Sequence, residues 1–229
     1  MVQPKHVGIL GAGSMGRGIA QVAAAHGWTV FLSDARSDAV DDAFAEIRTR
    51  FDRNVEKERM TATEADAAHA RLHRADTAEA FAPCELLLEA IVEDFDAKVE
   101  AVKAVKPSLG DRAIVATNTS SLSVSELGKG WGMSSRTVGM HFFNPAPIMR
   151  LVEIIAGEKT RAEVVDRAEA IAREWGKVTA RCADEPGFIV NHVARPYYLE
   201  AFRILEDRIA PADRIDGIMR LLGGFQIGR

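Results

Sequence analysis

Short apolar runs alternate along the first part of the chain with longer segments whose apolar residues recur every three or four positions. The short runs are typical of buried strands, and they lie at residues 6–10, 29–33, 85–90 and 113–117. The longer segments have the spacing of amphipathic helices, and they lie at residues 14–26 and 94–105. This strand–helix alternation predicts an α/β fold built on a parallel sheet.

Residues 37–73 break the alternation, because they are charged and helix-forming and lack the apolar runs of strands. They predict two helices joined near residues 60–63. There Thr61 and Glu64 have the spacing of a capping box that opens the second helix. We therefore expect an inserted helical pair at about residues 37–73 that projects from the sheet.

The alternation resumes in the second half of the chain. Strands are predicted at residues 137–143, 151–155 and 177–180, and a helix is predicted at residues 160–175. A Pro-Gly break follows at residues 184–187, and from Phe188 the pattern is helical. We therefore expect a Rossmann-type α/β domain at residues 1–184. The start of an all-helical C-terminal domain is expected at residues 185–229.

The composition narrows the class of protein. The chain has 229 residues, of which 47% are hydrophobic and 27% are charged, as expected of a soluble globular protein. It has no apolar run of about 18 residues that could cross a membrane and no signal-peptide pattern, so a cytoplasmic protein is expected. The net charge of −4 argues against nucleic-acid binding. Cys84 and Cys182 lack metal-ligand spacing, which favours free thiols and no metal site.

A glycine-rich turn follows the first predicted strand and opens the first predicted helix. It has the spacing Gly11-x-Gly13-x-x-Gly16, with Ser14 and Met15 in the same turn. In this pattern the first glycine permits the turn, the second lets a pyrophosphate approach, and the third lets helix and strand pack. All five residues are predicted to bind a dinucleotide, whose phosphates the N-terminus of the helix attracts.

An acidic residue at the end of the second strand indicates which dinucleotide is bound. Asp34 lies at the distance from the glycine turn that suits hydrogen bonds with both hydroxyls of the adenosine ribose. A carboxylate there repels a 2′-phosphate, so NAD is predicted rather than NADP, a preference that Arg36 weakens slightly. Because strand, turn, helix and acid occur together, a glycine turn without a ligand is disfavoured.

Two ionisable residues interrupt the apolar segment GMHFFNPAPIMRLVEII at residues 139–155. His141 and Glu153 fall on neighbouring predicted strands joined by a short turn, which can bring them side by side. Histidine can accept the proton released when an alcohol is oxidised, and a carboxylate on its other nitrogen fixes the tautomer. From this segment alone, a core histidine and a glutamate at a strand edge remain the favoured alternative.

Five motifs lie in one order along the chain: GAGSMGRGIA at residues 11–20, LEAIVED at 88–94, TNTSSLS at 117–123, HFFNPAPIMRLVEII at 141–155 and DEPGFIVNH at 184–192. Together they resemble the L-3-hydroxyacyl-CoA dehydrogenase family, in particular its bacterial 3-hydroxybutyryl-CoA dehydrogenases, over residues 7–224. The resemblance implies an NAD-dependent oxidoreductase that interconverts an L-3-hydroxyacyl-CoA, with a short acyl chain expected, and the 3-ketoacyl-CoA.

The same resemblance assigns catalytic residues. His141 is implied as the general base and Glu153 as the carboxylate that orients it. Ser120 is implied to lie near the substrate oxygen and the nicotinamide, and Asn191 to complete the polar cluster around the substrate. Without the resemblance, the segment of Ser120 could equally cap a helix, and Asn191 could be an ordinary first-turn residue.

The resemblance also implies residues that bind the cofactor and the substrate. The further cofactor contacts implied are Glu93, Lys98, Asn118 and Ser120, and the substrate contacts are Arg50, Lys57, Ser120 and Asn144. Arg50 and Lys57 lie in the basic stretch RTRFDRNVEKER of the helical insertion, where the acyl-CoA thioester is expected. Because acidic residues are interleaved there, the charge pattern alone favours a solvated helix face.

The chain departs from the family near its end. Family members usually continue past LLGGFQIG with helices that complete the C-terminal domain and a dimer interface. The C-terminal domain, for which the resemblance implies a role in substrate binding and dimerisation, is therefore expected to be truncated. A homodimer is expected where those helices are present. Two alternatives stay open: an NAD-dependent dehydrogenase of a free hydroxy or sugar acid, and an NAD-binding protein without catalytic activity.

Overall fold

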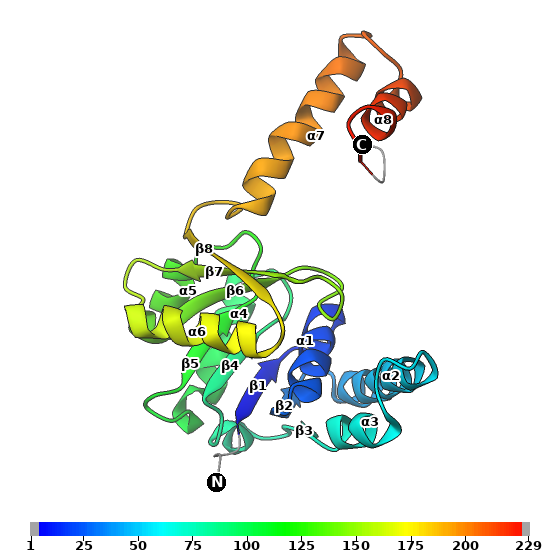
Figure 1. Cartoon of the computed structure of the whole chain (residues 1–229). Coiled ribbons are helices and arrows are strands. Elements are labelled where there is room, and N and C mark those ends of the chain that lie inside the picture. The colour runs from blue at the N-terminus through cyan, green and yellow to red at the C-terminus, as the bar shows by residue number, and fades with distance from the viewer. Residues whose placement is uncertain (1–4, 226–229) are drawn as a thin grey trace. The chain divides into compact units, whose positions relative to one another are not determined.

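The structure, a computed structural model, describes residues 5–225 of the chain. These residues divide into two compact units, the first ending at Glu185 and the second beginning at Pro186. The first unit is a sheet covered by helices, and the second consists of helices (Figure 1). The predicted order of an α/β domain followed by a helical segment is therefore confirmed.

One eight-stranded sheet forms the centre of the first unit, in the order β3-β2-β1-β4-β5-β6-β7-β8. Its strands are β1 (His6–Leu10), β2 (Thr29–Ser33), β3 (Leu72–Arg74), β4 (Leu86–Glu89), β5 (Ile114–Thr117), β6 (Thr137–Phe142), β7 (Leu151–Ala156) and β8 (Val178–Ala183). All neighbouring strands are parallel except β6 and β7, which are antiparallel. The first six strands have the Rossmann order, which reverses direction between β1 and β4.

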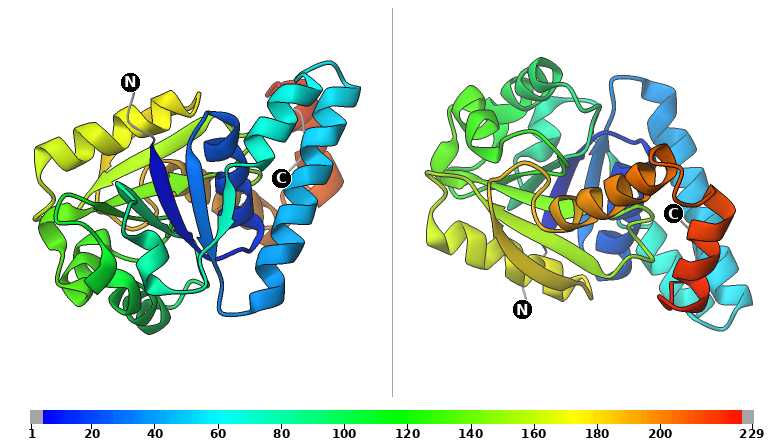
Figure 2. Two further views of the ribbon diagram at one scale, coloured as in Figure 1. Left: turned by 90° about the horizontal axis from the view of Figure 1, so that it is seen from below. Right: turned by 90° about the horizontal axis from the view of Figure 1, so that it is seen from above.

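Helices cover both faces of this sheet (Figure 1, Figure 2). The core on one face is built with α1 (Ser14–Ala25), α2 (Ser37–Glu56), α3 (Ala62–His69) and α6 (Ala162–Glu174). The core on the other face is built with η1 (Ala78–Phe81), α4 (Phe95–Val105) and α5 (Val124–Trp131). Two further short 3₁₀ turns are η2 (Lys106–Ser108) and η3 (Ser134–Arg136).

The strand β4 shows why the sequence of the sheet is so apolar. Leu86 and Leu88 lie in one core and Leu87 lies in the other, and all three are 0% exposed. Successive residues of a strand point to opposite faces, so a parallel strand covered on both faces is apolar throughout. The short apolar runs of the sequence therefore correspond to central strands.

The inserted helical pair consists of α2 and α3. The predicted capping box opens α3, since the Glu64 N–H donates to the Thr61 hydroxyl at 3.2 Å and the Thr61 N–H donates to the Glu64 carboxylate at 2.8 Å. The prediction that residues 37–73 contain no strand was wrong, because residues 72–74 form the edge strand β3 beside β2. Three residues are too few to show a period of two.

The helix α5 has no counterpart among the predicted elements. Its segment contains Gly128 and Gly130, which lower helix propensity and obscured it. The Ser123 side chain caps its start, and Gly132 ends it in the left-handed conformation at φ 63°. Tertiary packing therefore overrides the weak local preference, since Leu127 and Trp131 are fully buried.

The second unit contains α7 (Val190–Glu206) and α8 (Ala212–Leu221). Several large apolar side chains of this unit are exposed within residues 186–225, namely Val193, Leu199, Phe202, Ile209, Ile218, Leu221 and Leu222. None of the helices in the described residues has the length and apolar character needed to cross a membrane.

A buried lysine binds two carbonyl groups of the turn between β6 and β7. Lys177, which immediately precedes β8, donates from Nζ to the carbonyl oxygens of Ala146 at 2.5 Å and Met149 at 3.0 Å. Burial lowers the pKa of this ammonium. The turn also approaches α1 closely, because a Cβ added at Gly18 would lie 3.2 Å from the Ala146 Cβ. The turn is therefore fixed against both α1 and the sheet.

The carboxylate that follows β8 caps α5. Asp184 follows β8 and accepts hydrogen bonds of 2.8 Å from the Ser123 hydroxyl and from the Val124 and Ser125 N–H groups. Burial opposes ionisation of Asp184, but these hydrogen bonds prevail and lower its pKa. The segment that leads to the second unit is thereby tied to the start of α5.

Replacing Asp184 with Asn should destabilise the protein by about 1–2 kcal/mol at neutral pH, the usual value of a helix N-cap. Because the folded-state pKa of Asp184 is lowered, its contribution is present above the unfolded pKa and is lost as pH falls through the folded pKa. The difference between the two proteins in chemical denaturation should therefore shrink below about pH 4. Asp111→Asn, at an exposed position, is the control. A constant difference from pH 7 to pH 3 would contradict this account.

Candidate active site

The C-terminal ends of β1, β4, β5 and β6 meet along one border of the sheet, here called the carboxyl edge. Parallel strands bring the segments that follow them together at this edge, and ligands of open α/β sheets bind where the strand order reverses. The glycine turn follows β1, Glu93 follows β4, and Ser120 follows β5. His141 lies near the end of β6. The topology therefore gathers most of the predicted site residues.

The three glycines of the turn after β1 have different surroundings. Gly11 has φ 105°, and a Cβ added to it would lie 2.5 Å from the Ala90 carbonyl oxygen. A Cβ added at Gly16 would lie only 1.8 Å from the Gly11 carbonyl oxygen. Nothing lies within 4 Å of a Cβ added at Gly13. The first and third glycines are therefore required by packing, whereas the second leaves open space for a ligand.

The helix α1 begins at this open space. Its cap residue is Gly13, no side chain caps it, and its first turn contains no acidic residue. The free N–H groups of a helix start attract phosphate oxygens. Ser14 is exposed and Met15 is half-buried in this first turn. The turn therefore fits the pyrophosphate of a dinucleotide.

Asp34 follows β2 and braces the glycine turn. Its Oδ2 accepts a hydrogen bond of 2.8 Å from the Ala12 N–H, and its Oδ1 accepts one of 2.9 Å from the Arg36 N–H. A carboxylate has about four acceptor sites, so each oxygen keeps capacity for a ribose hydroxyl. The position and the half-buried state of Asp34 fit the predicted ribose contact.

His141 and Glu153 lie directly opposite each other across the antiparallel pair β6 and β7. The distance between His141 Nδ1 and Glu153 Oε2 is 2.7 Å. Glu153 is 0% exposed and His141 is 6% exposed, and the Phe143 ring lies 4.6 Å from the imidazole between ring centroids. An ionised Glu153 requires the proton on Nδ1, which makes Nε2 the acceptor of the imidazole. This arrangement suits a general base oriented by a carboxylate.

The loop after β5 is organised by Glu93. The Glu93 Oε1 accepts hydrogen bonds from the Thr119 hydroxyl at 2.6 Å and from the Ser120 N–H at 2.9 Å. Burial opposes ionisation of Glu93, but these hydrogen bonds and the charge of Lys98 lower its pKa to about 2. Asn118 accepts a hydrogen bond of 2.9 Å from the Phe142 N–H, which links this loop to β6. The structure thus brings together Glu93, Asn118 and Ser120, each of which the resemblance implied as a cofactor contact.

Lys98 lies deeper than the prediction of a cofactor contact requires. Its side chain is 1% exposed, and its Nζ lies 2.6 Å from Glu89 and 3.2 Å from Glu93. The structure therefore places Lys98 underneath Glu93. Glu89 and Lys177 were missed in the sequence. Glu89 is a carboxylate inside the apolar segment LLLEAIV, and a carboxylate inside an apolar segment is also what singled out Glu153.

The predicted substrate contacts are spread over three places. Asn144, in the turn after β6, accepts a hydrogen bond of 3.4 Å from the Ser14 hydroxyl. Arg50 donates to Glu46 at 2.5 Å, and Arg17 of α1 pairs with the same carboxylate. Lys57 is exposed and follows the end of α2. Arg17 was also missed, since nothing in the sequence links it to α2.

Asn191 belongs to the second unit, in the first turn of α7. Its place beside His141 therefore remains a prediction. Among the described residues, no cluster of three or more histidine, cysteine and acidic side chains could hold a metal ion.

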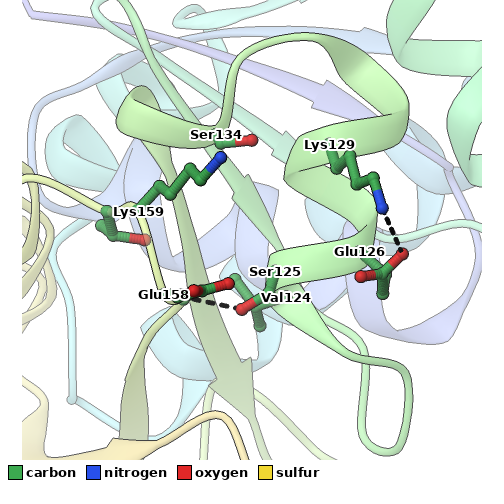
Figure 3. A pocket seen from close by; sticks show the side chains of 9 residues that line it. Val124, Ser125, Glu126, Lys129, Ser134, Glu158 and Lys159 are labelled. Atoms are coloured by element: carbon green, nitrogen blue, oxygen red, sulfur yellow. Dashed lines mark hydrogen bonds and ion pairs between the residues drawn. The ribbon is translucent and has the colours of Figure 1, made fainter.

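A separate pocket of about 140 Å³ lies between α5 and the segment after β7 (Figure 3). Lys129 pairs with Glu126 at 3.7 Å, and the Glu158 N–H donates to the Ser125 hydroxyl at 2.9 Å. The nine lining residues are Val124, Ser125, Glu126, Lys129, Ser134, Gly157, Glu158, Lys159 and Thr160. None of them was predicted from the sequence to be a site residue.

Comparison with known sequences gives the family of this site. Residues 6–185 match the family described as 3-hydroxyacyl-CoA dehydrogenase, NAD binding domain, and residues 187–229 match its C-terminal domain. The chain belongs to the 3-hydroxyacyl-CoA dehydrogenase family. The resemblance expected from the five motifs is confirmed, and the glycine turn with Asp34 lies in the family's NAD-binding domain.

Individual relatives agree with this assignment. The chain is 38% identical over 228 residues to the 3-hydroxyadipyl-CoA dehydrogenase of Escherichia coli (strain K12), covering 100% of this chain and 48% of that protein. It is 36% identical over 214 residues to the probable 3-hydroxybutyryl-CoA dehydrogenase of Deinococcus radiodurans, covering 93% of this chain and 77% of that protein. The chain thus spans about half the length of the first relative and about three quarters of the second.

A solved structure is also similar. The crystal structure of (S)-3-hydroxybutyryl-CoA dehydrogenase from Ralstonia eutropha has a TM-score of 0.95 and 35% sequence identity to this chain. The comparison covers 99% of this chain and 80% of that one. The predicted fold class, a Rossmann-type domain with an inserted helical pair and a helical C-terminal segment, is that of the family.

Two glycine substitutions in the turn should separate cofactor binding from folding. Gly13→Ala places a methyl group in open space, so the melting temperature should stay within about 2 °C while NAD affinity falls at least about tenfold. Gly16→Ala forces a methyl group against the Gly11 carbonyl and should cost at least about 2 kcal/mol of stability. Isothermal titration with NAD and thermal denaturation measure the two effects. Normal NAD binding by Gly13→Ala would show that the pyrophosphate lies elsewhere.

Proposed function

We propose that this chain catalyses the NAD-dependent interconversion of an L-3-hydroxyacyl-CoA and the 3-ketoacyl-CoA. The observation that carries the proposal is the buried pair of His141 and Glu153 at the carboxyl edge, beside the loops that fit a dinucleotide. A proton acceptor at this place suits oxidation of an alcohol next to a nicotinamide. The names of the relatives support CoA thioesters as the substrate class.

When bound, NAD would supply the oxidant, since its nicotinamide can take a hydride from the carbinol carbon. The chain supplies the proton chemistry. His141 Nε2 takes the hydroxyl proton, while Glu153 holds the proton on Nδ1 and stabilises the imidazolium that forms. Ser120 and Asn191 are proposed to position the substrate oxygen. In the reverse direction the imidazolium returns the proton to the carbonyl oxygen.

The coenzyme A part of the substrate is proposed to lie along α2. Arg50 and Arg17 share the single carboxylate of Glu46, so this cluster keeps a net positive charge. Lys57 adds a further positive charge where α2 ends. Phosphate groups favour such a surface. Asn144 lies beside the glycine turn and is proposed to contact the substrate near the cofactor.

We further propose that the protein forms a homodimer through its second unit. The exposed apolar side chains of α7 and α8 include Phe202 and Leu221, which are 62% and 85% exposed. A monomer rarely exposes so many large apolar groups on one small unit.

A substrate panel tests the proposed reaction. The protein should form NADH with (S)-3-hydroxybutyryl-CoA and with 3-hydroxyadipyl-CoA at rates at least about 100-fold above those with free 3-hydroxybutyrate or a sugar acid. Absorbance at the wavelength of NADH is the measurement. The ratio of kcat/KM values for the two thioesters then gives the acyl preference. Faster turnover of free acids would favour a hydroxy-acid dehydrogenase, and NAD binding without turnover would favour a non-catalytic protein.

Substitutions of His141 and Glu153, here called the dyad, test the proposed proton transfer directly. Glu153→Gln keeps the shape of the side chain but removes the charge, so kcat should fall at least about 100-fold. His141→Gln should cost at least as much, and the double variant little more than the worse single variant, because the two residues act as a unit. NAD affinity should survive in all three proteins. Additive losses, or near-normal turnover by His141→Gln, would remove these residues from the mechanism.

A further inference from the structure

A further buried ionisable group lies at the carboxyl edge, and the proposed reaction does not use it. Glu89 is the last residue of β4 and is 0% exposed. It pairs in register with Leu10 of β1 on one side and with Thr117 of β5 on the other. Its position therefore adjoins the point between β1 and β4 where the strand order reverses and where ligands of this fold bind.

Both carboxylate oxygens of Glu89 are hydrogen-bonded. Oε1 accepts from the Ile91 N–H at 2.8 Å and from Lys98 Nζ at 2.6 Å. Oε2 accepts from the Thr117 hydroxyl at 2.7 Å. The three donors come from the loop after β4, from α4 and from β5. One carboxylate thus holds together the three segments that surround the expected nicotinamide site.

The contacts continue outward through Lys98 to Glu93. The Lys98 ammonium is enclosed, so it acts on a ligand through Glu93, whose side chain is 37% exposed. Glu93 in turn accepts hydrogen bonds from the N–H groups of Ser120 and Ser121, at 2.9 and 3.2 Å. The loop of residues 118–121 is therefore shaped by a carboxylate that Lys98 holds in place.

A second branch of hydrogen bonds runs from the Glu89 carboxylate to the same loop, through groups that carry no charge. The Thr117 hydroxyl that donates to Glu89 also accepts a hydrogen bond of 3.2 Å from the Thr119 N–H. Both branches converge on residues 118–121, one through Lys98 and Glu93 and one through Thr117. Glu89 consequently supports the conformation of this loop through two separate chains of contacts.

Stability alone does not account for such a group. A buried ion pair costs much of what it gains, and apolar side chains of similar size would hold α4 against the sheet equally well. We propose that Glu89 and Lys98 are positioning residues, which preset Glu93 and the loop of residues 118–121 for the nicotinamide end of NAD. This inference rests on the proposed function of the carboxyl edge.

Three variants test the proposal: Glu89→Gln, Lys98→Met and the double variant. Each single variant removes the closest ion-pair partner of the other buried charge, at 2.6 Å, so both the melting temperature and NAD affinity should fall. The double variant buries neither charge, and its melting temperature should return to within about 3 °C of the parent. Its dissociation constant for NAD should still be raised about tenfold, because Glu93 has lost the cation that holds it. Recovery of both properties together would show that the pair serves stability only.

Kinetics separates positioning from proton transfer. In the double variant the KM for NAD should rise about tenfold, while kcat at saturating NAD should stay within about threefold of the parent. The dyad variants should show the opposite split. Because NAD binding is measured without a thioester, a protein that binds NAD normally but oxidises no thioester would reject the proposed function and leave this inference standing.

Two further variants keep the test decisive if the charge variants fold poorly. Thr117→Val changes no charge and little volume, but it breaks the second branch and leaves Glu89 Oε2 without this donor. The NAD dissociation constant should rise about threefold, and the melting temperature should fall by a few degrees. Glu169→Gln is the matched control, since Glu169 is also buried and pairs with Arg173 and Arg181, on α6 and β8 away from the site. It should leave NAD binding unchanged. Parent-like NAD affinity in Thr117→Val, or an equal loss in Glu169→Gln, would overturn the proposal.

Discussion

The antiparallel pairing of β6 with β7 sets the geometry on which the proposed chemistry depends. Its register places His141 opposite Glu153, with Met140 opposite Ile154 in the apolar layer of the other face. Side chains alternate between faces along a strand, so a slip of one residue would turn Glu153 into the core and away from the imidazole. The apolar neighbours therefore enforce the register, because that slip would also take them out of their core.

The turn that joins these strands contributes to the same constraint. Lys177 holds two of its carbonyl groups, and the close approach of Ala146 to Gly18 seats it on α1. The helix α1 is also the helix whose N-terminus borders the glycine turn. The cofactor turn and the dyad are thus linked through this packed contact and through the hydrogen bond from Ser14 to Asn144, so the spacing between nicotinamide and base is fixed by the fold.

The sequence predicted those parts of the site whose contacts are local or follow from a short turn. The glycine turn and Asp34 belong to one βαβ unit, and His141 and Glu153 belong to one hairpin, so the order of the elements allows both contacts. The family resemblance supplied the predicted roles of His141 and Glu153. Glu89, Lys98 and Thr117 meet only because β4, α4 and β5 pack side by side. The pattern of apolar residues in the sequence does not indicate this packing. The edge strand β3 is too short to be recognised, and the glycines of α5 hide a helix that packing stabilises. Asn191 lies in the other unit, and its role still rests on the family resemblance.

A crystal structure of the complex with NAD and acetoacetyl-CoA tests the central claim most directly. We predict that the 3-keto oxygen lies within about 3 Å of His141 Nε2 and that the keto carbon faces C4 of the nicotinamide. We also predict that the adenosine ribose bonds to Asp34 and that the pyrophosphate lies over Gly13. A 3-keto oxygen bound away from His141, or a nicotinamide that does not reach the loop of residues 118–121, would contradict the account.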